Sequence, residues 1–147
     1  MNRQIINIDN GLYLENLDIV VPWKTSVGYI TKYGQPEIIV HSDQRTDALW
    51  RNAKLFDGLT LDLTAMFWKT LFGRNKFNNA HAYIEREKFD IFKPHLDNYF
   101  RQEGFLTKQN DLEYYYKWTI NKCKIELGQR DRFGTYYYLD IKNKIWL

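Results

Sequence analysis

The chain has 147 residues, of which 44% are hydrophobic, 27% charged and 17% aromatic. This composition excludes an intrinsically disordered chain and suits one compact domain over residues 1–147. The formal net charge is only +3. Residues 74–147 hold fourteen basic and ten acidic residues, but no block of like charges forms the dense basic face typical of nucleic-acid-binding domains.

The sequence also indicates a cellular location. Apolar runs such as Ile19-Val20-Val21 are far shorter than the roughly 20 residues of a membrane-spanning helix. The first residues lack the features of a signal peptide, although a domain whose leader had been removed would look the same. The single cysteine, Cys123, excludes an internal disulfide and is expected to be a buried, inert thiol. We therefore expect a cytoplasmic protein without a membrane partner.

The first half predicts two hairpins and a short helix. Asp9-Asn10-Gly11 is a turn sequence between two apolar segments, and Asp57-Gly58 is a second and stronger one. Between them, Thr25 and Gly34 can begin and end a short helix. After Asp57-Gly58, apolar and polar residues alternate, which predicts a strand with one buried face. The apolar set is Leu59, Leu61, Leu63, Ala65 and Phe67.

The second half predicts a longer helix over residues 90–103, with Asp90 as N-cap, Pro94 at the end of the first turn and Gly104 as the stop. Strands are expected over residues 80–85, 112–120, 123–127 and 133–141, and the apolar residues 145–147 are expected to dock. The inward side chains of the last three strands include Leu112, Tyr114, Tyr116, Trp118, Phe133, Tyr137 and Leu139. The predicted fold is α+β, an antiparallel sheet with two helices on one face in a tandem αβββ-like plan.

Three segments of the first half carry a resemblance. The segments are Trp23–Pro36, with its Gly-x-Pro ending, Leu49-Trp50-Arg51-Asn52, and Phe56-Asp57-Gly58-Leu59. Together, over residues 23–67, they resemble a pattern in small bacterial proteins of the toxin-immunity type. The order of elements is similar in plan to the beta-lactamase-inhibitor-like fold, which is built from tandem helix-plus-strands units. The resemblance implies a non-catalytic protein that binds another protein.

Catalytic chemistry has few candidates in this sequence. His41-Ser42-Asp43 contains the residue types of a hydrolase triad, but neighbours in sequence cannot converge on one atom, and no Gly-x-Ser-x-Gly elbow occurs. His81 and His95 are expected on the surface. No pair of histidines has zinc-ligand spacing, and no glycine-rich phosphate loop is present. We therefore predict a protein that is not an enzyme and has no metal and no cofactor.

Tyrosines in the second half provide the binding candidate. Strand alternation places Tyr115, Lys117, Lys124, Tyr136 and Tyr138 on an exposed sheet face. Tyrosine is enriched in protein interfaces, so these five residues are predicted to bind a protein partner such as a toxin or an enzyme. Three alternatives stay open: aromatic pairing that only steadies the sheet, single-stranded nucleic-acid binding, which Glu113 and Glu126 oppose, and an enzyme with an unrecognised site around His41 or His81.

Overall fold

The computed structural model describes residues 7–144 as one helix, one 3-10 turn and eleven strands. The α-helix is α1 (Arg86–Phe100) and the 3-10 turn is η1 (Ile30–Lys32). The strands are β1 (Gly11–Leu14), β2 (Ile19–Pro22), β3 (Glu37–Val40), β4 (Arg45–Leu55), β5 (Leu59–Thr70), β6 (Gly73–Arg74), β7 (Asn79–Ile84), β8 (Phe105–Lys108), β9 (Tyr114–Ile120), β10 (Cys123–Asp131) and β11 (Thr135–Asn143).

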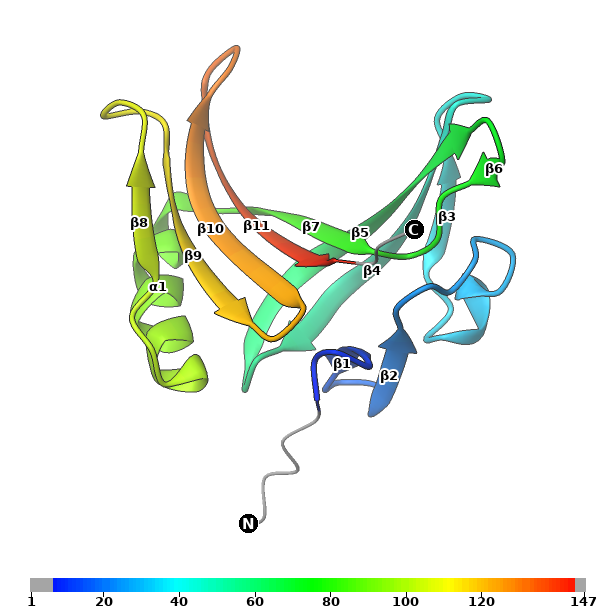
Figure 1. Ribbon diagram of the computed structural model, residues 1–147, viewed down its shortest axis with the longest axis horizontal. Coiled ribbons are helices and arrows are strands. Elements are labelled where there is room, and N and C mark those ends of the chain that lie inside the picture. The colour runs from blue at the N-terminus through cyan, green and yellow to red at the C-terminus, as the bar shows by residue number, and fades with distance from the viewer. Residues whose placement is uncertain (1–6, 145–147) are drawn as a thin grey trace.

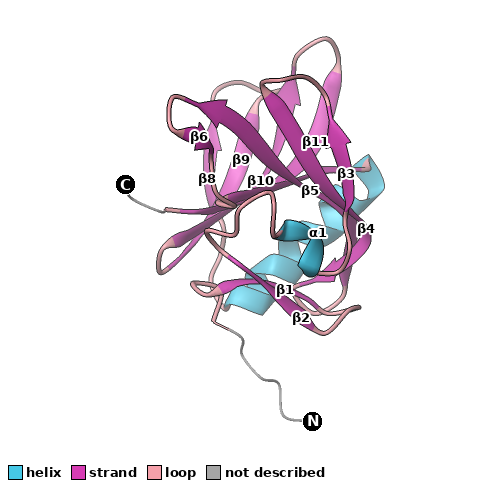
Figure 2. Ribbon diagram, turned by 90° about the vertical axis from the view of Figure 1, so that its right-hand side faces the viewer, coloured by secondary structure: helices cyan, strands magenta, loops and turns pink. Residues whose placement is uncertain are grey.

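A nine-stranded antiparallel sheet dominates the molecule. Its strand order is β3-β4-β5-β7-β11-β10-β9-β8, with β6 paired to β5, while β1 and β2 form a separate hairpin. The sheet is strongly bent, so that β8–β10 and β3–β4 rise on either side of its middle strands (Figure 1). Both α1 and the β1–β2 hairpin lie below it (Figure 2). The predicted α+β class with an antiparallel sheet is confirmed.

The core lies between the lower face of the sheet and these covering elements. The alternation predicted for β5 is confirmed, because Leu59, Leu61, Leu63, Ala65 and Phe67 are all buried. The hydrophobic cluster joins them to side chains from the hairpin, from η1 and from α1. These covering side chains are Leu12, Leu14, Val21, Ile30, Phe89, Phe92 and Leu96.

The prediction of two helices is wrong. The segment over residues 25–34 forms only the three-residue η1, in which Ile30 alone is buried. Gly34 has a positive φ of 78° and ends the turn as expected. A segment that contains Gly28 and has one buried apolar side chain gains too little from packing to sustain an α-helix. The tandem plan therefore lacks its first helix.

The real helix begins earlier than predicted. Glu85 is its N-cap, so Pro94 lies inside α1 rather than in its first turn. The chain leaves the helix at Arg101, which has a left-handed φ of 54°, and not at Gly104. Burial of Phe89, ahead of the predicted start, explains why the boundary based on Asp90 and Pro94 is too late: this side chain packs against Tyr137 of the sheet at a ring distance of 4.8 Å.

The N-terminal hairpin turns at a different place. Asp9 and Asn10 do lie in a turn, closed by a hydrogen bond from the Asn10 N–H to the Asn7 carbonyl at 3.0 Å. However, the paired strands are β1 and β2, which are joined through residues 15–18. The apolar Ile5 and Ile6, and the predicted docking of residues 145–147, lie outside the described residues.

The second half differs from its prediction in one additional strand and in two side chains. Strand β8 was not expected, and it pairs with β9 at the edge of the sheet. Leu112 and Phe133 were expected inward, but both are exposed. They precede β9 and β11 in the connecting segments, so the alternation of the strands does not extend to them.

No helix among residues 7–144 is long and apolar enough to cross a membrane.

Candidate functional site

The upper face of the sheet, opposite the core, is the candidate site, and we call it the open face. Strand pairing defines its members, because directly opposed residues share a face. From β7 to β9 these include His81, Tyr83, Tyr136, Tyr138, Asp140, Lys124, Glu126, Gly128, Arg130, Tyr115 and Lys117. From β4 and β5 they include Arg45, Asp47, Thr64, Met66 and Trp68. The predicted partner-binding residues thus all lie on this face, as strand alternation indicated.

Four of those five residues are only partly exposed, and the fifth is buried. Tyr115, Lys117, Lys124 and Tyr136 are half-buried. Tyr138 is 1% exposed, which contradicts the prediction that it is a surface residue. The register is the expected one, but the expected exposure is wrong at this position.

Gly128 explains the burial of Tyr138. The two residues are directly opposed in the β10–β11 pair. A Cβ atom at position 128 would lie 2.6 Å from the Tyr138 hydroxyl oxygen and 2.8 Å from the Cβ of Tyr115. The phenol ring therefore occupies the space that a side chain at position 128 would fill. Arg130 covers the ring from above, with its guanidinium carbon 4.3 Å from the ring centre, and burial raises the pKa of Tyr138 to about 12.

His81 is also buried, which corrects the prediction of a surface histidine. Its Nδ1 is hydrogen-bonded to the carboxylate of Asp140, which lies opposite it on β11. Its ring stacks on Tyr138 at 6.1 Å and meets the ring of Tyr83 edge-on at 4.8 Å. The Nε2 atom is covered and has no hydrogen-bond partner among residues 7–144. The pair therefore belongs to the packed layer beneath the surface of the open face.

His95, the third histidine, lies on α1 away from the open face. Its Nε2 is 2.6 Å from the carbonyl oxygen of Phe56. This contact ties the helix to the β4–β5 turn, and the side chain is half-buried, whereas a surface position was predicted.

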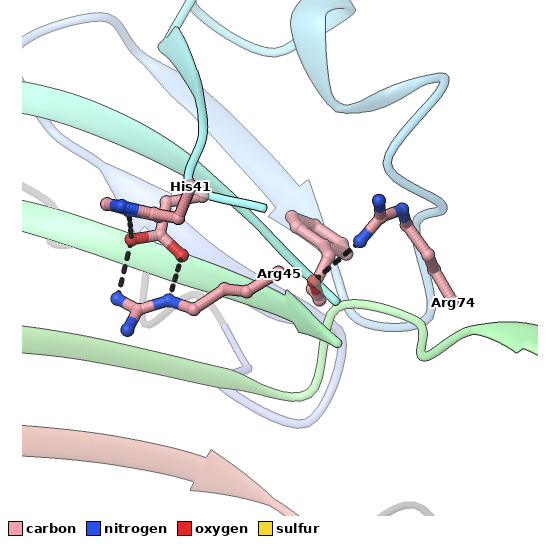
Figure 3. Close-up of polar contacts among 5 residues, drawn as sticks. His41, Arg45 and Arg74 are labelled. Carbon is pink, nitrogen blue, oxygen red and sulfur yellow. Dashed lines mark hydrogen bonds and ion pairs between the residues drawn. The ribbon is translucent and has the colours of Figure 1, made fainter. Parts of the chain in front are cut away.

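A second polar cluster lies where β3 passes into β4, and sequence reasoning missed it. His41 and Arg45 converge on one carboxylate, that of Asp47 (Figure 3). His41 Nε2 lies 2.8 Å from it, and Arg45 donates two hydrogen bonds at 2.7 and 2.8 Å. The guanidinium carbon of Arg45 also lies 5.4 Å from the ring centre of Trp68. The partner of His41 is thus Asp47, and not the adjacent Ser42 and Asp43.

The charge of Asp47 is stabilised by this cluster. Burial acts to raise the pKa of the Asp47 carboxyl, but the hydrogen bonds from Arg45 and His41 outweigh it and hold the pKa below its usual range. A carboxylate with a lowered folded-state pKa contributes stability above its unfolded pKa of about 3.9 and loses it as the pH falls through the folded value.

We expect Asp47→Asn to lower the free energy of unfolding at pH 7 by about 1–3 kcal/mol, because the charge-assisted hydrogen bonds are lost. The difference from the natural sequence should shrink as the pH falls from about 4 through the lower folded-state pKa, because the unfolded chain takes up a proton at Asp47 before the folded chain does. Urea unfolding at several pH values measures both effects. Asp43→Asn, at an exposed position two residues before Arg45, is the control and should change stability by less than about 0.5 kcal/mol.

An apolar hairpin tip adjoins this cluster. Leu71 and Phe72, between β5 and β6, are 97% and 98% exposed. Arg74 closes the hairpin by donating hydrogen bonds to the carbonyls of Phe67 and Asp43 at 3.2 and 3.3 Å. Phe133 is fully exposed at the β10–β11 tip, which rises at the same upper side of the molecule (Figure 1).

The described residues offer little for metal or thiol chemistry. No group of three or more histidine, cysteine, aspartate or glutamate side chains in residues 7–144 could hold a metal ion. Cys123 is fully buried, as predicted, and burial raises the pKa of its thiol. A shallow pocket borders the open face and is lined by Tyr83, Tyr136, Arg86, Leu112 and Gln129 among others.

Comparison with protein-family models, with curated proteins and with solved structures gives no match to this chain.

Proposed function

We propose that this chain is a non-catalytic, cytoplasmic protein-binding module of the immunity or inhibitor type. It binds a protein partner, such as a toxin or an enzyme, through the open face. One observation carries the proposal: aromatic side chains stand at the surface of this face above a layer of buried polar side chains that hold them in place. Tyr83 is 72% and Trp68 48% exposed, and half-buried Tyr136 lies beside Tyr83.

The support beneath these aromatic residues favours binding. The rings of Tyr83 and Tyr136 pack edge to face at 5.6 Å, and Tyr83 also packs on buried His81. Side chains that are already fixed lose little entropy when a partner binds, so their contact area contributes more to affinity. Both tyrosines line the shallow pocket, which gives a partner side chain a place to insert.

The β5–β6 tip supports a partner with an acidic surface. Leu71 and Phe72 are flanked by Lys69, Arg74 and Lys76. An exposed apolar tip rimmed by charge is typical of a binding surface, and this rim is basic. The tip is next to Trp68, so one partner can contact both the tip and the open face.

The alternatives are less well supported. The enzyme alternative rests on His41 or His81. A catalytic histidine must reach its substrate, whereas His81 Nε2 is covered by protein and His41 Nε2 is engaged by the Asp47 carboxylate at 2.8 Å. Single-stranded nucleic acid needs a basic stacking surface, whereas Glu126 and Asp140 are opposed to each other in the middle of the open face. A protein partner fits this mixture of charges and aromatic rings.

The test measures binding of the purified chain to each purified product of the genes that flank its own gene. Tyr136→Ala should weaken the complex about 30-fold or more, which corresponds to about 2 kcal/mol. Tyr29→Ala is the matched control, because Tyr29 is 60% exposed but lies beside η1, outside the open face; it should leave affinity unchanged.

Two outcomes would contradict the proposal. One is an equal loss of affinity for Tyr136→Ala and Tyr29→Ala. The other is tight binding of single-stranded oligonucleotides that Lys117→Glu abolishes, which would favour the nucleic-acid alternative.

A further inference from the structure

Strand β3 is an open edge of the large sheet. It is the first strand in the sheet order and pairs only with β4, and it lies at the right-hand end of the sheet in Figure 1. Its sequence, Glu37-Ile38-Ile39-Val40, has three consecutive β-branched apolar residues. Ile38 is 38% and Val40 69% exposed. Folded proteins protect such edges, because free backbone groups beside apolar side chains recruit another strand.

The backbone groups that face outward can be identified from one hydrogen bond. The His41 N–H donates to the Arg45 carbonyl on β4 at 3.1 Å. In an antiparallel strand, the backbone N–H and C=O groups of alternate residues point to the same neighbouring strand. The backbone groups of Ile39 therefore also point to β4, and those of Ile38 and Val40 point away from it. Their N–H and C=O groups have no partner within residues 7–144. Four backbone hydrogen-bonding groups therefore line this edge.

On the core side of the sheet, the side chains of β3 have no neighbouring strand beyond them to cover them. Ile38 is opposed to Ala48 and Val40 to Thr46, and both of these β4 residues are buried. The buried layer thus extends to β4 and stops at β3 because no further strand follows. One added strand would cover Ile38 and Val40 and would extend that layer.

We propose that β3 pairs with β3 of a second copy of this chain, antiparallel and centred on Ile39. Strand β3 is complementary to itself in this register. Ile38 then opposes Val40 of the second copy, and each such pair exchanges two hydrogen bonds, so that all four outward groups are used. Glu37 opposes His41 of the second copy at both ends; within its own chain Glu37 already pairs with Arg51 at 3.0 Å and His41 with Asp47 at 2.8 Å. Pro36, which has no N–H, ends the pairing.

The other edge of the sheet does not offer this complementarity. In β8 the bond from the Gln109 N–H to the Glu113 carbonyl, 2.9 Å long, places Leu106 and Lys108 outward by the same alternation. Self-pairing there would set Lys108 against Leu106. A lysine on an edge strand is a known protection against pairing, and Lys108 already forms an ion pair with Asp111 at 2.8 Å.

A disulfide across the twofold axis tests the register. Ile39 would face Ile39 of the second copy in a pair without mutual hydrogen bonds, with Cα atoms about 4.5 Å apart, within the range that a disulfide spans. Ile39→Cys should therefore give a disulfide-linked dimer under mild oxidation. Cys123 is fully buried and does not compete.

Two matched variants control this experiment. Glu37→Cys places the thiols of two copies four residues apart along the strands, about 13 Å, and should stay monomeric under oxidation. Thr107→Cys is the equivalent position on β8 and should behave in the same way. Cross-linking of either control as fast as Ile39→Cys would overturn the proposal.

Sedimentation of the natural sequence gives an independent test without any new cysteine. Across concentrations from about 1 µM to about 1 mM we expect a monomer–dimer equilibrium. Val40→Lys should weaken it at least about tenfold, because it sets a charge against Ile38 of the second copy, whereas Leu106→Lys should leave it unchanged. A monomer at every concentration, or association that Leu106→Lys abolishes, would overturn the proposal.

Discussion

Tyr138→Ala is expected to lower the free energy of unfolding by about 3–5 kcal/mol, as for other buried aromatic side chains. Tyr138 is 1% exposed, and its removal opens a cavity above Gly128 that the strand backbone cannot fill. It also removes the ring on which His81 stacks, beside the buried Asp140 carboxylate. Urea denaturation followed by circular dichroism measures the loss.

Tyr83→Ala is the control for this experiment. Tyr83 is directly opposed to Tyr138 on the same face but is 72% exposed. Its loss should cost less than about 1 kcal/mol, the usual contribution of a cross-strand pair. Equal losses for the two tyrosines would mean that the ring of Tyr138 is not packed into the face.

Trp118→Ala should also cost about 3–5 kcal/mol. Trp118 is fully buried and joins α1 to β9. Its indole N–H lies 3.1 Å from the Asp97 carboxylate and 3.3 Å from the Gln102 carbonyl. Gly104 packs against the ring so closely that a Cβ there would lie 2.7 Å from it. Removing the ring therefore takes away both core volume and the anchor of the helix end.

Trp68→Ala is the matched control, since Trp68 is 48% exposed on the open face; it should cost less than about 1 kcal/mol. Trp118→Phe separates the two contributions, because it keeps most of the apolar surface but loses the N–H donor, and about 1–2 kcal/mol is expected. Thermal or urea unfolding gives all three values. A smaller loss for Trp118→Ala than for Trp68→Ala would contradict the assignment.

Periodicity predicted the parts of the fold that local patterning determines. Alternation from Leu59 to Phe67 identified the buried side of β5, and Asp57-Gly58 placed its hairpin, because both signals act between near neighbours. The start of α1 was misplaced because Pro94 was assigned to the first turn, whereas Phe89 gains enough by packing on Tyr137 to extend the helix toward the N-terminus. Such a gain depends on a residue 48 positions away and leaves no local trace.

The sequence predicted on which side of the sheet the candidate site residues lie, but not how deeply each side chain is buried. Alternation correctly placed Tyr115 and Tyr136 on the side opposite the core, whereas the burial of Tyr138 depends on Gly128 in the neighbouring strand. A glycine inside a strand is a signal of close approach, and it was available in the sequence. The pairing of His81 with Asp140 joins residues 59 positions apart, and without the strand order no pattern connects them.

The place of β11 within the sheet affects how the protein must be made. This strand follows every other described strand along the chain, yet it lies between β7 and β10 and joins the two halves of the sheet. During synthesis on the ribosome, β7 in the β3–β7 half and β10 in the β8–β10 half each keep an unpaired edge until residues 135–143 emerge. Joining of the two halves of the sheet is therefore a late, long-range step. A nascent chain stopped before Thr135 exposes two unpaired strand edges, which chaperones can bind or which can aggregate.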